Sequence, residues 1–192
     1  MRKPHLILWS VVVLLALAGV GYLLYERVSW VELDLSLIES YAATESYSEL
    51  IRRVREREDP SDGFTFVVLG DTRSNLAMAR EVLQEAVKEN PAFILSNGDI
   101  VRKGRPEEYV AHHLQLVKEI APHPFIPVPG NHEEGPNRDF AAFRAVYGEE
   151  RFNFDFGECR FVGINNGDHT GLSGSDLRYL EQELSRPASE GQ

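Results

Sequence analysis

Short apolar runs alternate with helix-like patterns along most of this chain. Runs rich in β-forming residues at 64–69, 92–95 and 125–128 predict three buried strands. Helical spacing of apolar residues predicts a helix over 76–87, and a second helix is expected over 106–120, where a proline begins the segment. Strands that alternate with helices predict an α/β fold with parallel neighbouring strands.

The same signals continue toward the C-terminus. They predict a short helix over 139–147, strands near 152–156 and 160–164, and a last helix over 176–184. Polar residues cluster directly after each of the first three strands. Open α/β sheets bind ligands at the carboxyl ends of their strands, so candidate chemistry is expected at that edge.

The N-terminus carries a different pattern. Residues 6–25 form an uncharged, mostly apolar run of 20 residues that follows Arg2 and Lys3. A helix of about 20 apolar residues crosses a bilayer, so the run favours a membrane anchor within residues 1–27, with the N-terminus cytoplasmic. The alternative is a cleaved signal peptide, with an A-x-A-like site at residues 16–18. The first places the main domain on the outer side of the membrane, and the second makes it secreted or periplasmic.

The segment over 28–63 is predicted to be a partly helical stalk. Apolar residues alternate over 31–37 like a short strand, and the charged stretch 45–58 shows helical spacing. A turn-forming cluster at residues 60–63 marks the boundary of the main domain, which is expected over 64–192.

The net charge and the cysteine count limit what the chain can bind. The formal net charge is −10, and residues 28–192 alone carry −12. A nucleic-acid-binding surface is not expected, because neutralising phosphates requires an excess of Lys and Arg. Cys159 is the only cysteine, which excludes a disulfide within the chain and a cysteine-rich metal site.

The strand ends offer a set of possible metal ligands. Asp71 follows the first predicted strand, Asp99 the second, and Asn131 with His132 the third. Oxygen and imidazole donors suit Mn, Fe, Zn or Mg. Each motif alone is typical of a turn, and the informative feature is that all three occur in order.

In this order the motifs Gly70-Asp71, Asn97-Gly98-Asp99 and Gly130-Asn131-His132-Glu133 resemble those of the calcineurin-like metallophosphoesterases, which include the purple acid phosphatases. Residues 152–157, 160–165 and 175–180 are also similar to that family's central hairpin and following helix. The resemblance implies a four-layer α/β/β/α sandwich that hydrolyses a phosphate ester.

The resemblance also implies roles for single residues. Asp71 would bind the first of two metal ions (Mn, Fe or Zn), Asp99 would bridge both ions, and Asn131 would bind the second. His132 would donate a proton to the leaving group or stabilise charge on the phosphate. Two such ions polarise the phosphate and generate hydroxide at neutral pH.

Arg73 departs from the family pattern, which usually has histidine there. Arginine stays protonated and has no free lone pair, so it cannot ligate a metal. One hypothesis makes Arg73 a clamp for the substrate phosphate. The other makes it an ion-pair partner of Asp71 that competes with a metal. Glu133 is a candidate to orient a neighbouring residue.

Two histidine motifs that complete the family's site are not found after His132. His169 is interpreted as a loop residue, because no motif frames it. The site and much of the second sheet are therefore expected to be incomplete, as in a fragment. The leading hypothesis is a membrane-tethered metallophosphoesterase, and the alternative is a non-catalytic tethered binding module or an inactive remnant.

Overall fold

The computed structural model describes residues 15–20, 35–57, 63–73, 75–167 and 171–187. The chain divides into two compact units, residues 1–35 and 36–192. In the first unit, residues 15–20 are helical, and the rest of the predicted anchor over 6–25 lies outside the described residues. None of the helices in the described ranges combines the length and apolar character that a bilayer crossing requires.

The main sheet has three parallel strands, as the sequence predicts. They are β1 (Val67–Leu69), β2 (Ile94–Ser96) and β3 (Phe125–Pro127), in the order β1-β2-β3. Val67 pairs with Ile94, and Ile94 pairs with Phe125, so the three carboxyl ends lie at one edge. β3 is buried along its length, whereas Val68 in the middle of β1 is 50% exposed.

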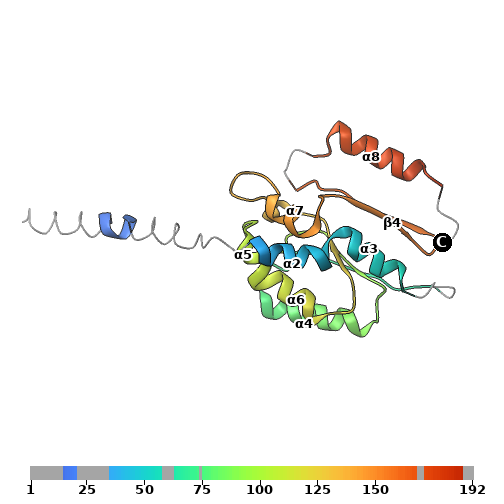
Figure 1. Ribbon diagram of the computed structural model, residues 1–192, viewed down its shortest axis with the longest axis horizontal. Helices are drawn as coiled ribbons and strands as arrows, with labels where there is room; N and C mark the ends of the chain where they lie inside the picture. Colours follow the sequence, from blue (N-terminus) through green and yellow to red (C-terminus); the bar gives the residue numbers. More distant parts are fainter. Residues whose placement is uncertain (1–14, 21–34, 58–62, 74, 168–170, 188–192) are drawn as a thin grey trace, which may run out of the picture. The chain divides into compact units, whose positions relative to one another are not determined.

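A hairpin packs against this sheet through aromatic rings. It consists of β4 (Phe152–Phe156) and β5 (Cys159–Gly163), which are antiparallel. Phe93, next to β2, lies 5.2 Å from Phe154 and 5.0 Å from Phe161 between ring centroids. The last helix, α8 (Gly174–Ser185), lies beside the hairpin in Figure 1, and Asn153 of β4 donates a hydrogen bond to the Tyr179 hydroxyl. The described residues thus give a sheet–hairpin–helix stack, consistent with a calcineurin-like fold.

Two helical segments lie side by side on another part of the domain (Figure 1): α4 (Leu76–Lys88) and α6 (Leu114–Glu119). The Asn75 side chain caps α4 by accepting a hydrogen bond from the Met78 amide. Arg80 joins the two helices through hydrogen bonds of 2.6 and 2.9 Å to Glu119.

The helix predicted over 106–120 forms over 106–119, but it is not α-helical throughout. It consists of α5 (Pro106–Glu108), a π-helical turn η1 (Tyr109–His113), and α6. A π turn holds one residue more than an α turn, which changes the face that the following residues present. Tyr109 and His113 are both buried within it. The predicted helix over 139–147 is α7 (Ala141–Tyr147).

Of the stalk predicted over 28–63, the structure describes residues 35–57 and Gly63: the helical part of the prediction is confirmed, but residues 36–57 pack within the domain and not outside it. Residues 35–37, expected in a strand, begin the helix α2 (Leu35–Glu45), in which Ile38 and Tyr41 are buried at helical spacing. The next helix, α3 (Tyr47–Arg55), buries Leu50 and Val54, and the Tyr47 hydroxyl donates to the Pro127 carbonyl at 2.5 Å. The charged residues of α3 lie on its outer face, while its apolar face is buried in the core. Residues 36–57 therefore belong to the domain.

Candidate functional site

The two strand-end aspartates sit on unusual backbone. Asp71 follows β1 with φ +60°, and Asp99 follows β2 with φ +58°. This left-handed region costs most residues about 1–2 kcal/mol and is most often adopted by Gly, Asn and Asp. The Asp71 amide donates to the Gly98 carbonyl at 3.0 Å, and the Arg73 amide donates to the Asp99 carbonyl at 3.1 Å. Backbone hydrogen bonds therefore hold the two loops side by side.

Arg73 connects the two carboxylates. Its Nη1 contacts Asp71 Oδ1, and the same nitrogen lies 2.5 Å from Asp99 Oδ2. The Asp71 side chain is 69% exposed, whereas those of Arg73 and Asp99 are 20% and 23% exposed. The structure thus contains the Asp71 ion pair that the second hypothesis for Arg73 expects, and it adds Asp99 to that pair.

Asp99 also reaches the third strand end. Its Oδ1 accepts a hydrogen bond from the His132 amide at 3.2 Å. The His132 ring places Nδ1 at 2.7 Å from the Arg102 carbonyl. A carbonyl oxygen only accepts, so Nδ1 carries the proton in the neutral ring. The other ring nitrogen, Nε2, is then the one left to exchange a proton with a ligand: it accepts a proton in the neutral ring and donates one only when the ring is doubly protonated.

Glu133 fixes the loops after β2 and β3. It lies in the short 3-10 turn η2 (Asn131–Glu133), and its side chain is fully buried. Its carboxylate accepts four backbone N–H groups, from Asp99 (2.7 Å), Ile100 (2.8 Å), Val101 (3.0 Å) and Gly130 (2.6 Å). Burial raises the pKa of Glu133, and the backbone donors oppose that rise. The orienting role expected of Glu133 acts through the backbone of both loops.

Close backbone contacts add to this arrangement. A Cβ on Gly98, whose φ is +94°, would lie 2.3 Å from the Gly130 amide nitrogen. A Cβ on Gly167, in the loop after β5, would lie 2.5 Å from the Gly130 carbonyl carbon. The Asn-Gly-Asp motif signals the first contact. The contact at Gly167 carries no sequence signal, because it joins segments far apart in the chain.

Few of the described side chains at this edge could act as metal ligands. Asn131 is half-buried at the start of η2, directly after Gly130. Within the described ranges, no three His, Cys, Asp or Glu side chains gather into a metal-binding group. Two carboxylates and an amide suit a hard cation chemically. They do not fit two ions, because three donors cannot fill two coordination spheres and Arg73 already contacts both carboxylates.

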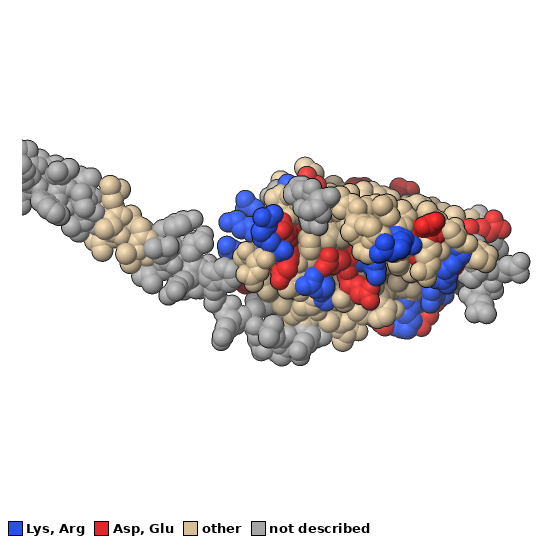
Figure 2. All heavy atoms as spheres, turned by 90° about the horizontal axis from the view of Figure 1, so that it is seen from above, with Lys and Arg blue, Asp and Glu red and all other residues tan. Residues whose placement is uncertain are grey.

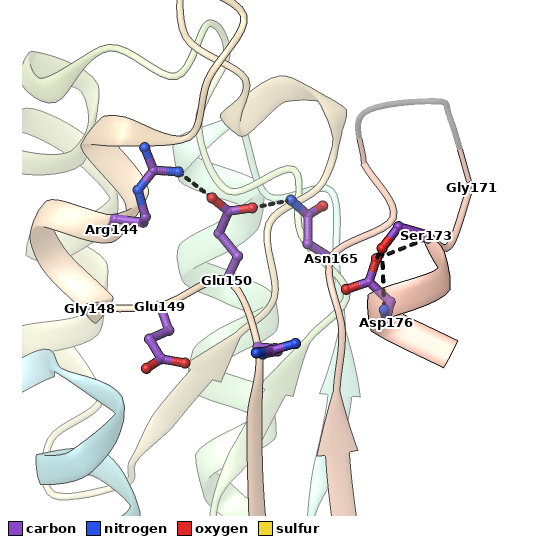
Figure 3. A pocket seen from close by; sticks show the side chains of 9 residues that line it. Arg144, Gly148, Glu149, Glu150, Asn165, Gly171, Ser173 and Asp176 are labelled. Carbon is purple, nitrogen blue, oxygen red and sulfur yellow. Dashed lines mark hydrogen bonds and ion pairs between the residues drawn. The ribbon is translucent and has the colours of Figure 1, made fainter. Parts of the chain in front are cut away.

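A separate pocket of about 360 Å³ lies near the N-terminus of α8 (Figure 3). Figure 3 shows Glu150 between Arg144 and Asn165, whose side-chain amide donates to Glu150 at 2.7 Å. Asp71, Asp99, Asn131 and His132 do not line this pocket. His169 falls outside the described residues. The pocket is lined by both acidic and basic side chains, and two of them, Arg144 and Glu150, form an ion pair, so it offers no charge of one sign.

Charged side chains are mixed on the surface as well. On the face seen in Figure 2, Lys and Arg residues lie next to Asp and Glu residues. The described ion pairs include Arg80–Glu119 and Arg144–Glu150. The net negative charge is therefore interleaved with basic groups on that face.

The sequence matches a family model described as calcineurin-like phosphoesterase over residues 64–189. This range contains β1 to β5 and all the strand-end residues described above. A search of curated proteins finds no match to the chain. The resemblance carried by the three strand-end motifs is thereby confirmed.

Proposed function

The chain belongs to the calcineurin-like phosphoesterases, and on this premise we propose that its strand-end cluster serves metal-dependent hydrolysis of a phosphate ester. The cluster consists of Asp71, Asp99, Asn131 and His132. The observation that supports this assignment best is the Asp99 carboxylate, which is linked to both neighbouring strand ends. A carboxylate held in this way is suited to a charged ligand at the edge of the sheet.

Asp71, Asp99 and Asn131 are the residues that would hold a divalent or trivalent cation such as Mn, Fe or Zn. A bound cation of this kind polarises a phosphoryl oxygen and lowers the pKa of a coordinated water. The two-ion form that the resemblance implies requires donors in addition to these three.

His132, with a proton on Nε2 as well as on Nδ1, is proposed to donate the Nε2 proton to the leaving-group oxygen, which leaves the ring neutral. Its Nδ1 is engaged with the Arg102 carbonyl, which fixes the ring and leaves Nε2 for the substrate. Its backbone is tied to Asp99, so the imidazole keeps a constant relation to the carboxylate that would hold the metal. A positioned general acid of this kind contributes about 10²- to 10⁴-fold to a rate.

Hydrolysis of p-nitrophenyl phosphate by the full chain, with Mn²⁺ and with EDTA, tests this proposal. We expect activity that depends on Mn²⁺, and we expect His132→Ala to lower kcat by about 10²- to 10⁴-fold while Mn²⁺ binding stays unchanged. His112→Ala is the control, because His112 is exposed on η1. Activity that survives His132→Ala, or that ignores Mn²⁺, would overturn the proposal.

A location outside the cytoplasm is part of the proposal. It is supported by the uncharged run over residues 6–25 and by Arg2 and Lys3 before it. A reporter fused after Gln192 should be active only if it works outside the cytoplasm. N-terminal sequencing of the mature protein separates an intact anchor from a cleaved signal peptide.

A non-catalytic binding module is the second candidate. The contact of Arg73 with both carboxylates favours it, because a neutralised acidic pair binds a metal less readily. Such a module would bind inorganic phosphate without hydrolysing the aryl phosphate, so binding without turnover distinguishes the two candidates.

A further inference from the structure

We infer that Arg73 is a built-in counter-ion that competes with a divalent cation for Asp71 and Asp99, and that a cation which takes this pair releases Arg73 to bind the substrate's phosphate. The inference rests on the proposed function in one respect, namely that the cluster receives a metal. It concerns a residue that no metal-ligand role can explain, because a guanidinium has no free lone pair.

The contacts of Arg73 have the form of a cation site. A single nitrogen, Nη1, contacts one oxygen of Asp71 and one oxygen of Asp99. Both carboxylates therefore face one positively charged point. A divalent cation that binds both carboxylates would need the same point, so Arg73 and the cation exclude each other.

The carboxylate pair does not depend on Arg73 for its position. The Asp71 loop is held by the hydrogen bond that the Asp71 amide donates to the Gly98 carbonyl, and the Asp99 loop is held by the hydrogen bond that the Asp99 amide donates to the Glu133 carboxylate. Removing the guanidinium therefore leaves two carboxylates on fixed backbone, where they repel each other and attract a cation from solution. Asp71 is 69% exposed, which gives a dissolved ion access to the pair.

A released Arg73 gains a new role. Its planar guanidinium can donate two parallel hydrogen bonds to a phosphate. The two hypotheses for Arg73, ion pair and phosphate clamp, then describe two states of the same residue. Metal binding and phosphate binding become coupled, because the first frees the group that serves the second.

Mn²⁺ titration of the full chain by calorimetry tests the competition. We expect Arg73→Gln to bind Mn²⁺ about tenfold more tightly than the unaltered chain, since two partly exposed ion pairs no longer oppose the metal. Arg102→Gln is the matched control, because it removes the same charge from an exposed position three residues after Asp99. Adding Asp99→Asn to Arg73→Gln should abolish the gain, which locates the bound ion. Circular dichroism verifies the fold, and Arg73→Met is a second neutral variant.

The coupling has its own readout. Inorganic phosphate should bind the Mn²⁺-loaded chain about tenfold more tightly than Mn²⁺-loaded Arg73→Gln, because one charge-assisted clamp is lost. Without Mn²⁺ the two chains should bind phosphate alike. A difference of the same size without Mn²⁺ would overturn the release of Arg73.

The other possible results of the Mn²⁺ titration also test the competition between Arg73 and the metal. Equal or weaker Mn²⁺ binding by Arg73→Gln would overturn the competition, while the proposed function would still be judged by the hydrolysis assay. An equal gain in Arg102→Gln would overturn it too, because the effect would then be a general charge effect. If no variant binds Mn²⁺, both the inference and the metal-dependent function are wrong.

Discussion

The candidate site has two sides that are built differently. On the β2–β3 side, the fully buried Glu133 accepts four backbone N–H groups and joins two loops. On the β1 side, Asp71 is largely exposed and its side chain contacts Arg73. β1 is also the less buried strand, with Val68 half-exposed, whereas β3 is buried throughout.

The difference separates two tasks. The buried side places Asp99 and the His132 backbone, because a buried carboxylate with all its acceptors used tolerates little movement. The exposed side holds a charge that solvent and ions can reach, because exposed ion pairs are weak. A site that exchanges a cation needs both a fixed frame and an accessible partner.

Two glycines test this contrast most strongly. Gly98→Ala places a Cβ 2.3 Å from the Gly130 amide nitrogen and on backbone with φ +94°. We expect it to lower the free energy of unfolding by about 3 kcal/mol or more, as overlaps with fixed backbone and strain at a special φ do. Gly70→Ala, on the β1 side, meets nothing closer than 3.5 Å and should change stability by less than about 1 kcal/mol.

Urea denaturation of both variants gives the comparison. If Gly70→Ala destabilises the chain as much as Gly98→Ala, the β1 side is as tightly packed as the other, and the contrast between the two sides is wrong.

Glu133→Gln tests the residue that holds the buried side of the site together. One carboxylate oxygen becomes an NH₂ group, which faces backbone N–H donors and cannot accept from them. Leaving such buried donors unpaired costs about 1–3 kcal/mol of unfolding free energy. Glu134→Gln is the neighbouring control, since Glu134 is in a surface ion pair with Arg138 and its loss should cost below about 1 kcal/mol.

Thermal and urea unfolding measure the two variants side by side. Equal effects would mean that the four backbone hydrogen bonds of Glu133 contribute no more than a surface ion pair does.

The sequence predicts the edge of the sheet well, because its signals are local. Each apolar strand is followed at once by its polar residues, and parallel strands bring their carboxyl ends to one edge. This reasoning correctly brings Asp71, Asp99 and His132 together. The cap of α4 at Asn75 is likewise a local feature, since it acts within one helical turn.

Long-range contacts are the part that the sequence could not show. The contact of Arg73 with Asp99 joins residues 26 positions apart, and no local pattern announces it. Tyr47 reaches the Pro127 carbonyl 80 positions away, which places a segment expected to be a stalk inside the domain. The charge of that segment was visible in the sequence, but the partner of its apolar face was not.

The smallest effect that we expect is on the pH dependence of stability, and it comes from a histidine that packs against β3 on the buried side of the site. His113 is fully buried next to Phe125 of β3, with 5.3 Å between ring centroids, and its Nε2 shares a hydrogen bond with the Tyr147 hydroxyl. Burial lowers the pKa of His113 to about 3, well below the ordinary value near 6.5.

The sign of the effect follows from proton binding. Between pH 6.5 and 3 the unfolded chain binds a proton at His113 that the folded chain does not, so stability falls as the pH falls. The slope from one such group is at most about 1.4 kcal/mol per pH unit. We expect His113→Gln to reduce the loss of stability between pH 6.5 and 5.5 by about 1 kcal/mol, which is below the maximum because the unfolded histidine is only half-protonated at pH 6.5. His112→Gln, at an exposed position, should retain the full loss. Urea unfolding at the two pH values measures both. If the free energy of unfolding of His113→Gln depends on pH as strongly as that of the unaltered chain, other groups cause the pH dependence. A neutral buried His113 beside β3 would then not contribute to it.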